Sequence, residues 1–420
     1  MGMTLAEKIF SEHAGRAVKA GEIVVADLDA MMTHDGNRPL ALDVFRRMKG
    51  RKLCDPQKVI QMIEHHYPAP GAANALAHSK MRQFHQEMGG VFYEGEGICH
   101  SVMPEKGHVL PGELVVGTDS HTCTYGALGA FSAGVGSTDM AVAMISGKLW
   151  FMVPETIKMN ITGTLPPGVF AKDIILHIIA SITADGATYK AVEFAGPVIE
   201  NLSMDARFTI ANMAIEMGAK AGMIAPDQTT LDWVNRRNPA RTFTPHVPDA
   251  DARYAQEMTF DVTRLSPYVA KPHRVDNGVP LEEVIGTPIH QGNLSTCTAA
   301  RIEDLRIAAE MLKGKRIAPG IRFFVVPSSR EVMKNALDEG ILATLIDAGA
   351  HIKSSSCAGC SGGSAYALLA DEEVAITTAN RNFQGRLGNP KAFIYLASPA
   401  TVVASVLEGK IADPRPYFSA

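Results

Sequence analysis

Three of the six cysteines stand in turns rich in serine and glycine, where a thiol is free to bind a metal group. Cys357 and Cys360 form a C-x-x-C pair in SSSCAGCSGG, and Cys297 lies in GNLSTCTAARIEDLR. A structural zinc site needs four ligands, and no second pair of the C-x-x-C or H-x3-H kind stands nearby. Three thiolates suit a cubane iron–sulfur cluster whose remaining iron can act as a Lewis acid on a substrate oxygen. Zinc, redox chemistry and inert thiols stay open on this spacing alone.

Acid–base chemistry is indicated by the triplet Asp119-Ser120-His121, which follows the apolar run 113–118 (ELVVGT). The run predicts a strand, and α/β sheets present their ligand sites at the carboxyl ends of strands. A positioned acid of this kind can help a hydroxyl to leave as water. Because Asp and Ser also cap helices well, a capping role is the alternative.

Four further segments place a histidine or an acid in a turn or at the end of an apolar run. Each has an ordinary alternative as a bare turn, a solvated helix end or a surface acid. The candidates are His34 and Asp35 in MMTHDGNRP, Glu64 and His65 after VIQMI, His100 in EGICHSVMPEKG, and Glu193 in KAVEFAG.

Carboxylate binding is indicated by the turn NRNFQGR, which begins at Asn380 and contains Arg381 and Arg386. An arginine can hold a carboxylate through two parallel N–H donors, so two arginines in one turn suit a dicarboxylic acid. The alternative is a basic turn on the surface.

The elements that must position these residues alternate along the chain. Strands are predicted by short β-branched runs at 112–118, 156–163 and 321–327. Helices are predicted by apolar residues at helical spacing in 59–66, 170–182 and 329–349. Alternation of this kind indicates an α/β protein with largely parallel sheets. A break near 154 and a polar, proline-rich stretch predict three α/β units, at 1–154, 155–260 and 261–420.

Composition narrows the function classes. The chain has 420 residues, of which 46% are hydrophobic and 20% charged, so wholesale disorder is excluded. Lys and Arg number 40 against 44 Asp and Glu, a net charge of −4, which leaves no basic excess for nucleic acid. No apolar stretch approaches the roughly 20 residues of a bilayer span, and the N-terminus lacks the apolar core of a signal peptide. We expect a cytoplasmic protein with reduced cysteines and no membrane or nucleic-acid partner.

Three long motifs resemble the aconitase superfamily. They are GTDSHTCTYGALGAFSAGVGSTD (117–139), the arrangement of Cys297 with Cys357-x-x-Cys360, and TTANRNFQGRLG (377–388). The likeness runs nearly end to end and is closest to the large subunits of 3-isopropylmalate dehydratase, homoaconitase and dimethylmalate dehydratase. It implies three α/β/α domains around a central [4Fe–4S] cluster and a hydro-lyase for a small 2-hydroxy dicarboxylic acid. The swivel domain of single-chain aconitases has no counterpart here, so we expect a small-subunit partner that carries it, in a heterodimer or heterotetramer.

The resemblance also implies a role for each candidate residue. The cluster would be held by Cys297, Cys357 and Cys360, with one iron lacking a protein ligand. The substrate would be contacted by Arg381, Arg386, Asn380, Ser120 and His34. The acid and base groups would be Asp119, His121, His100, His65, Glu64, Glu193 and Asp35. Glu193 would be a partner of the active-site histidines.

Two positions depart from the family pattern. Glu64 stands where the family usually has Asp before the histidine, and Ala299-Ala300 stand where Asn-Gly commonly follows Cys-Thr. The first leaves the geometry of the His65 contact open, and the second could change hydrogen bonding beside the cluster. The leading substrate is 3-isopropylmalate, with homoaconitate, 2,3-dimethylmalate, citramalate and maleate as alternatives. A remote alternative is an RNA-binding aconitase relative.

Overall fold

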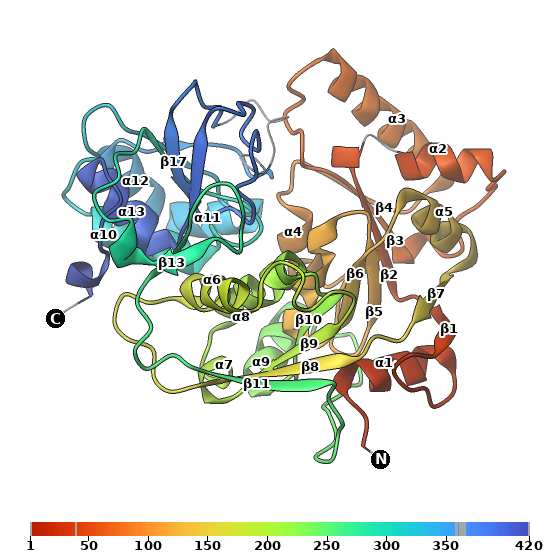
Figure 1. Ribbon diagram of the computed structural model, residues 1–420. Coiled ribbons are helices and arrows are strands. Elements are labelled where there is room, and N and C mark those ends of the chain that lie inside the picture. The colour runs from red at the N-terminus through yellow and green to blue at the C-terminus, as the bar shows by residue number, and fades with distance from the viewer. Residues whose placement is uncertain (1, 38–39, 358–359, 361–366, 419–420) are drawn as a thin grey trace.

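The computed structural model describes residues 2–37, 40–357, 360 and 367–418 (Figure 1). Its N-terminal part is built on a five-stranded sheet of order β4-β3-β2-β5-β6 in which every neighbouring pair is parallel. The strands are β2 (Ala30–His34), β3 (Val59–Ile63), β4 (Val91–Glu94), β5 (Leu114–Gly117) and β6 (Phe131–Gly134). The helices are α1 (Leu5–Ala14), α2 (Leu40–Arg47), α3 (Ala72–Met88), α4 (Cys99–Glu105) and α5 (Ser137–Ser146), with short η1 (Asp35–Asn37), η2 (Pro56–Lys58) and η3 (Ser120–Leu128).

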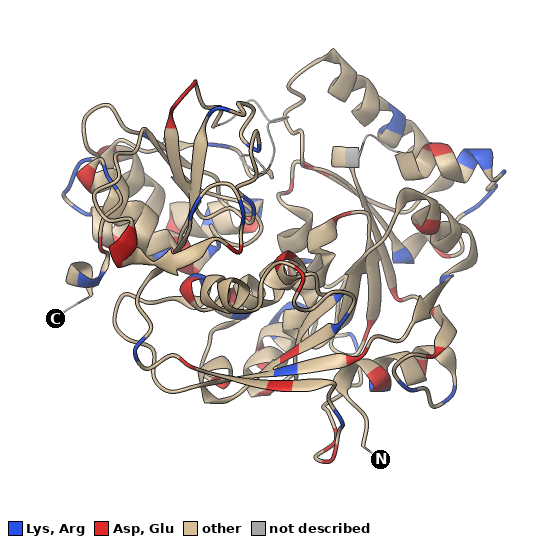
Figure 2. Ribbon diagram, viewed as in Figure 1, with Lys and Arg blue, Asp and Glu red and all other residues tan. Residues whose placement is uncertain are grey.

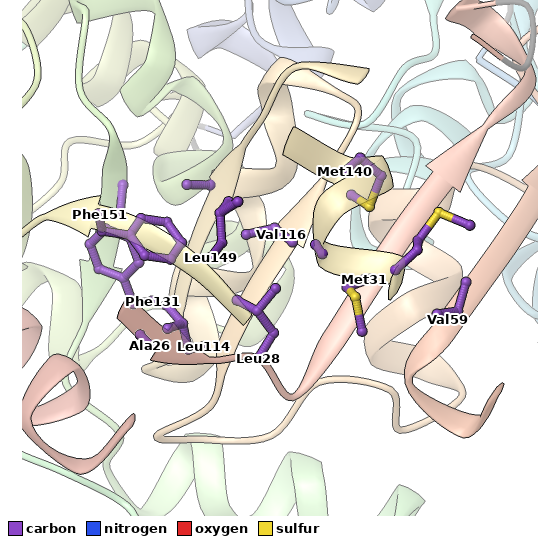
Figure 3. Packing of buried hydrophobic residues seen from close by; sticks show 14 of the residues in the cluster. Ala26, Leu28, Met31, Val59, Leu114, Val116, Phe131, Met140, Leu149 and Phe151 are labelled. Carbon is purple, nitrogen blue, oxygen red and sulfur yellow. The ribbon is translucent and has the colours of Figure 1, made fainter. Parts of the chain in front are cut away.

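An antiparallel ribbon of two strands, β1 (Ile23–Asp27) and β7 (Lys148–Met152), stands beside this sheet. The inner side chains of the ribbon join the same core, as Figure 3 shows for Ala26, Leu149 and Phe151 packed near Phe131 and Leu114. Strand alternation therefore leaves the other side chains of the ribbon facing outward.

The middle of the chain forms a four-stranded parallel sheet of order β10-β9-β8-β11. Its strands are β8 (Thr156–Thr162), β9 (Ala191–Ala195), β10 (Ala221–Ile224) and β11 (Gln256–Asp261). Its helices are α6 (Ala171–Ile182), α7 (Pro197–Glu200), α8 (Met204–Asn212) and α9 (Gln228–Arg237), with η4 (Met213–Met217). The sheet and α6 share one apolar core, which explains why the helix is hydrophobic over most of its surface.

The C-terminal part is a seven-stranded mixed sheet of order β13-β12-β18-β17-β14-β15-β16. Its strands are β12 (Tyr268–Ala270), β13 (Gly278–Pro280), β14 (Gln291–Leu294), β15 (Arg322–Val325), β16 (His351–Ile352), β17 (Val374–Thr377) and β18 (Phe393–Leu396). Its helices are α10 (Ile302–Leu312), α11 (Arg330–Asp338), α12 (Ile341–Ala348) and α13 (Pro399–Glu408), with η5 (Leu281–Glu283) and η6 (Arg415–Tyr417). The five strands from β14 to β18 pair in parallel, so their carboxyl ends share one edge.

The α/β class and the three predicted strands are confirmed, but two helix predictions are wrong. Residues 59–63 form strand β3, whose five side chains are all buried, and not the start of a helix. A central parallel strand covered on both faces reads as a continuous apolar run, which periodicity cannot distinguish from a buried helix. The segment 329–349 is two helices, because Gly340, at φ +72°, turns the chain between α11 and α12.

Charged residues of both signs are interspersed over the whole molecule (Figure 2). This distribution agrees with the net charge of −4. Among the described residues, no helix is both long and apolar enough to cross a membrane.

Candidate active site

The candidate acid–base residues gather at the carboxyl edge of the five-stranded sheet. His34 is the last residue of β2, Glu64 and His65 follow β3, and Asp119 lies two positions after β5. These three strands are parallel neighbours, so their carboxyl ends bring the residues together although they are far apart in sequence.

Asp119 is the centre of this group. Its carboxylate accepts a hydrogen bond from His100 Nε2 at 2.8 Å and lies 3.5 Å from both His65 Nε2 and His121 Nδ1. His34 Nε2 is 3.7 Å away. Burial alone would raise the pKa of Asp119, but hydrogen bonds from His100, His121 and His65 hold it well below its ordinary range. The carboxylate also accepts from the His121 backbone N–H at 2.7 Å, so the capping role and the site role coexist.

Glu64 contacts its neighbour His65 directly. The glutamate carboxylate accepts a hydrogen bond from His65 Nδ1, so the longer side chain still reaches the histidine. The His65 ring stacks on the His34 ring with centroids 4.1 Å apart. Burial would lower the pKa of His65, but the charges of Glu64 and Asp119 outweigh burial and raise it well above its usual value. An imidazolium at this position is therefore favoured.

Asp35 holds the backbone from which His65 projects. One carboxylate oxygen accepts from the N–H groups of Glu64 and His65 at 2.9 and 2.8 Å, and the other from the N–H of His66 and from His78 Nε2, both at 2.9 Å. Burial would raise the pKa of Asp35, but the His78 bond and the backbone donors lower it. Because both oxygens accept from this backbone, Asp35 orients the segment that carries His65.

A second carboxylate, Glu216 in η4, pairs with the other side of the histidine group. It accepts from His121 Nε2 at 2.9 Å and from Arg381 Nε at 2.7 Å. Burial would lower the pKa of His121, but Asp119 and Glu216 raise it. The same contacts hold the pKa of Glu216 below its usual value although burial opposes them. Ser120 Oγ lies 3.4 Å from His121 Nδ1, at the margin of this group.

The structure corrects the expected position of Glu193. Its buried carboxylate accepts from the Leu5 backbone N–H at 2.7 Å and from the Tyr254 hydroxyl at 3.0 Å. Glu193 points from the middle of β9 toward the start of α1, and Glu216 occupies the histidine-pairing position that we expected for it. Nothing local in NMAIEMG singles out Glu216 as a partner of a residue 95 positions away.

The three candidate cysteines converge. The side chains of Cys297, Cys357 and Cys360 form one buried cluster together with Ile98. The backbone N–H of Cys357 donates to the Glu64 carbonyl at 3.3 Å, which places the thiols beside the acid–base group. The cysteine segment therefore lies against the segment that carries Glu64 and His65.

N–H donors face two of these sulfurs. Arg386 Nη2 lies 2.9 Å from Cys360 Sγ, and Asn380 Nδ2 lies 3.4 Å from Cys297 Sγ. Burial raises the pKa of the Cys297 thiol to about 12. The Cys357 hydrogen bond, together with the Arg386 charge, holds the pKa of Cys360 well below its ordinary range. Three buried sulfurs, two of them with N–H donors toward them, fit the ligand set of an iron–sulfur cluster, because hydrogen bonds to sulfur are a usual feature of such sites.

Residues from other segments hold the Asn380 turn in place. Lys172 of α6 donates to the carbonyls of Thr378 and Ala379 at 3.1 and 2.8 Å, and burial lowers its pKa to about 7. The Asn380 amide donates to the side-chain oxygen of Asn212, at the end of α8. Sequence reasoning missed Lys172 and Asn212, because each lies in a helix with no local mark of function.

Of the remaining cysteines, Cys99 and Cys123 are buried, whereas Cys54 is exposed. Cys54 lies in the polar connection RKLCDPQK between α2 and β3, where charged neighbours keep the chain at the surface. The three cysteines outside the cluster thus differ in environment, and Cys123 donates to the Asn212 carbonyl at 3.4 Å.

Comparison with known sequences places the chain in a family. The family model for aconitase (aconitate hydratase) matches residues 7–294 and 283–409. The chain belongs to the aconitase family. Among curated relatives, a 3-isopropylmalate dehydratase large subunit 1 from Methanopyrus kandleri is 49% identical over 420 residues, covering 100% of both chains.

Two further relatives carry different names. A probable 3-isopropylmalate dehydratase large subunit from Methanothermobacter thermautotrophicus is 48% identical over 419 residues, with 99% of each chain covered. A probable methanogen homoaconitase large subunit from the same organism is 46% identical over 420 residues, with 98% of each covered. The aconitase-family relatives at this level of identity therefore differ in the activity that they are named for.

The Ala299-Ala300 departure has a structural consequence in this aconitase-family chain. Both residues are buried, and Ala300 has φ +59°, in the left-handed region that favours glycine. The carbonyl of Ala300 accepts from the Ser328 N–H at 2.9 Å. Beside it, Arg301 donates to Ser101 Oγ at 3.1 Å and to the Cys297 carbonyl at 3.3 Å, and so links the Cys297 turn to the helix that carries His100.

Proposed function

We propose that this chain is the large subunit of an iron–sulfur hydro-lyase that interconverts 3-isopropylmalate and 2-isopropylmalate through their enoate, a step of leucine biosynthesis. The proposal rests on one observation, which is that the candidate cluster ligands, acid–base groups and carboxylate-binding arginines lie together in the folded chain. Three buried thiols, a carboxylate among four imidazoles, and two arginines come from distant segments to one place. The relatives at 49% and 48% identity that are named for this activity support the substrate.

Cys297, Cys357 and Cys360 would hold the cluster. When bound there, a [4Fe–4S] cluster supplies an iron without a protein ligand, and hence a Lewis acid for the hydroxyl that must leave. The chain's own contribution is a buried pocket for the sulfurs with N–H donors from Arg386 and Asn380. Such donors orient the ligands and tune the group that they hold.

His65 would deliver the proton that lets the hydroxyl leave as water. Its pKa is raised well above the usual value, so it carries a proton near neutral pH. Glu64 occupies Nδ1, so Nε2, which faces Asp119, is the nitrogen that would give the proton. The Asp35 clamp on the backbone fixes the direction of the ring. An acid held in place in this way typically contributes 10²–10⁴-fold in rate.

Arg381 and Arg386 would bind the two carboxylates of the substrate. Each uses one N–H group inside the protein, on Glu216 and on Cys360 respectively. A guanidinium has five N–H donors, so both keep donors for a bidentate carboxylate contact. Ser120 and His34, at the edge of the same group, would add polar contacts to the substrate.

A second chain would complete the site. In aconitase-type enzymes the base that removes the proton beside the carboxylate lies on the swivel domain, which the resemblance leaves to a small subunit. The relatives are named large subunits, which supports a partner of this kind. We expect the purified 45.0 kDa chain to bind a cluster but to turn over negligibly until the partner is added.

Homoaconitate is the second candidate substrate, because the 46% identical relative is named for homoaconitase. The test is anaerobic purification of the chain with its small partner, followed by a panel of 2-hydroxy dicarboxylic acids scored by enoate absorbance. The proposal expects the highest kcat/KM for 3-isopropylmalate. A higher value for homoaconitate would replace the substrate, and no turnover of any diacid by the cluster-loaded pair would reject the activity.

A further inference from the structure

Lys172, in the first turn of α6, is a buried lysine that the proposed mechanism does not use. It is 2% exposed, and its Nζ donates to the carbonyls of Thr378 and Ala379 at 3.1 and 2.8 Å and to Met213 Sδ at 3.6 Å. These three acceptors match the three N–H groups of an ammonium, one more than a neutral amine can supply. The contacts therefore favour the charged form of Lys172.

Among the residues that the structure describes, no carboxylate forms an ion pair with this ammonium. The neighbouring Asp173 turns its carboxylate to two backbone N–H groups, at 2.8 and 2.9 Å. A buried charge without a partner is unfavourable, and burial lowers the pKa of Lys172 to about 7. The negative charges of Glu216 and of Cys297 in its thiolate form oppose burial and favour the ammonium.

The carbonyls that Lys172 binds belong to the turn that faces Cys297. They directly precede Asn380, whose Nδ2 lies 3.4 Å from Cys297 Sγ. The Thr378 carbonyl also accepts from Thr298 Oγ1 at 2.6 Å, and Thr298 follows Cys297 in the chain. Lys172 is thus connected to the Cys297 segment by two routes, one through the Asn380 amide and one through the Thr298 hydroxyl.

The other cation near the sulfurs stands in a different position. Arg386 lies 2.9 Å from Cys360 Sγ and, in the proposed function, also binds the substrate. Lys172 comes from α6, which packs against helix α8 of the middle part and strand β12 of the C-terminal part (Figure 1). Because Lys172 is buried there, its charge stays on the Cys297 side of the site whatever the substrate does.

We propose that Lys172 is a positioning residue whose buried positive charge offsets the negative charge of the three cysteine thiolates when they hold iron. This inference rests on the proposed function, since it needs a cluster at Cys297, Cys357 and Cys360. Thiol ligands lose their protons when they bind a metal, so loading the site brings negative charge into a buried pocket. A fixed cation nearby stabilises that charge, and the net charge around a cluster is one determinant of its reduction potential.

The experiment compares Lys172→Met and Lys172→Arg with the parent chain after anaerobic reconstitution. Lys172→Met removes the charge, whereas Lys172→Arg keeps the charge and changes the shape of the side chain. The readouts are the reduction potential of the cluster, the rate of iron release to a chelator, and the melting temperature. We expect Lys172→Met to make the potential more negative and to release iron roughly 10–100-fold faster, the range typical when a partner around a metal site is lost. Lys172→Arg should keep both values close to the parent, even where its melting temperature falls.

The matched control is Lys220→Met. Lys220 is partly buried, donates to the Gly134 carbonyl at 3.2 Å, and has its pKa lowered by burial, as Lys172 does. No hydrogen bond of the described residues joins it to the Asn380 turn, so this change should leave the potential and the iron release unaltered. If Lys172→Met does not fold, Lys172→Gln takes its place, because its amide can still donate to a carbonyl while the charge is lost.

The outcomes separate this inference from the proposed function. An unshifted potential in a cluster-loaded variant without the charge overturns the role of Lys172 and leaves the proposed function standing. An equal shift in Lys172→Arg also overturns it, because shape and not charge would then be responsible. A parent chain that takes up no iron overturns the cluster itself, and the inference with it.

Discussion

The Glu216→Gln variant tests whether Glu216, and not Glu193, is the carboxylate that supports the active-site histidines. The structure places Glu216 beside these histidines, whereas the sequence indicated Glu193. The Glu216 side chain is only 4% exposed and accepts N–H groups from His121 and Arg381 at 2.9 and 2.7 Å. Both N–H groups bind the same oxygen, Oε1, so glutamine keeps the size and one acceptor for them but removes the negative charge beside the imidazole and the guanidinium. Both partners then lose the carboxylate that orients them.

The expected loss follows from these two contacts. A hydrogen bond to a charged group is worth roughly 1.5–3 kcal/mol, and breaking a buried pair on one side costs about 3–5 kcal/mol. Because about 1.4 kcal/mol corresponds to a factor of ten, kcat/KM of the complete enzyme should fall roughly 10²–10³-fold. Iron content should stay unchanged, since Glu216 contacts none of the three cysteines through the hydrogen bonds described above.

The matched control is Glu193→Gln, the same change at a carboxylate of equal burial. Glu193 binds the Leu5 N–H and the Tyr254 hydroxyl, so its loss should lower the melting temperature and leave kcat/KM within about twofold. The assay is kcat/KM together with iron content and melting temperature for both variants. Near-normal kinetics in Glu216→Gln, or an equal kinetic loss in Glu193→Gln, would refute the assignment.

Three other changes test separate parts of the structure. Arg386→Lys keeps the charge beside Cys360 but loses the bidentate fork, so kcat/KM should fall by the equivalent of about 2–5 kcal/mol while the visible spectrum persists. Burial raises the pKa of Glu105 from 4.5 to about 7, so the stability linked to its protonated form is present below pH 4.5 and lost as the pH rises through 7. Glu105→Gln should therefore melt higher than the parent at pH 8 and nearly equally at pH 4.5, with a gain of roughly 1–3 kcal/mol at the higher pH. Ala300→Gly should relieve left-handed strain of about 1–2 kcal/mol, less about 0.5–1 kcal/mol of chain entropy, and so raise the melting temperature slightly.

Each of these three predictions has a result that would contradict it. Unchanged kinetics in Arg386→Lys would make the turn an ordinary basic loop. A pH-independent difference between Glu105→Gln and the parent would show that the carboxyl does not titrate in this window. A lower melting temperature for Ala300→Gly would mean that the turn at this position carries no strain.

Sequence patterns predicted the elements whose signal is local. The run ELVVGT is a strand because it is short, β-branched and bounded by turn residues, and β5 forms there. The run VIQMI has no local feature that distinguishes a strand from a buried helix. It lies in the centre of a parallel sheet with both faces covered, and only the packing around it decides that it is a strand.

The residues of the candidate site also fall into those that a local sequence pattern could predict and those that it could not. Motif residues such as Asp119, His121 and the three cysteines could be named from the sequence, because each stands in a distinctive turn. Their partners could not, because the contact between Asn212 and Asn380 spans 168 positions and depends on how two sheets meet. The prediction that Glu193 pairs with the histidines was wrong for the same reason. The direction of a side chain on a strand is fixed by the register of its sheet, which the sequence does not give.

We propose that Cys297, Cys357 and Cys360 hold an iron–sulfur cluster in this chain. The most direct measurement is the iron and sulfide content and visible absorption of the chain after anaerobic reconstitution, beside Cys297→Ser and the control Cys123→Ser, which changes a buried thiol outside the cluster. We expect about four irons and four sulfides per chain in the parent and the control, and loss of both from Cys297→Ser. Full iron and colour in Cys297→Ser, or zinc without sulfide in the parent, would contradict it.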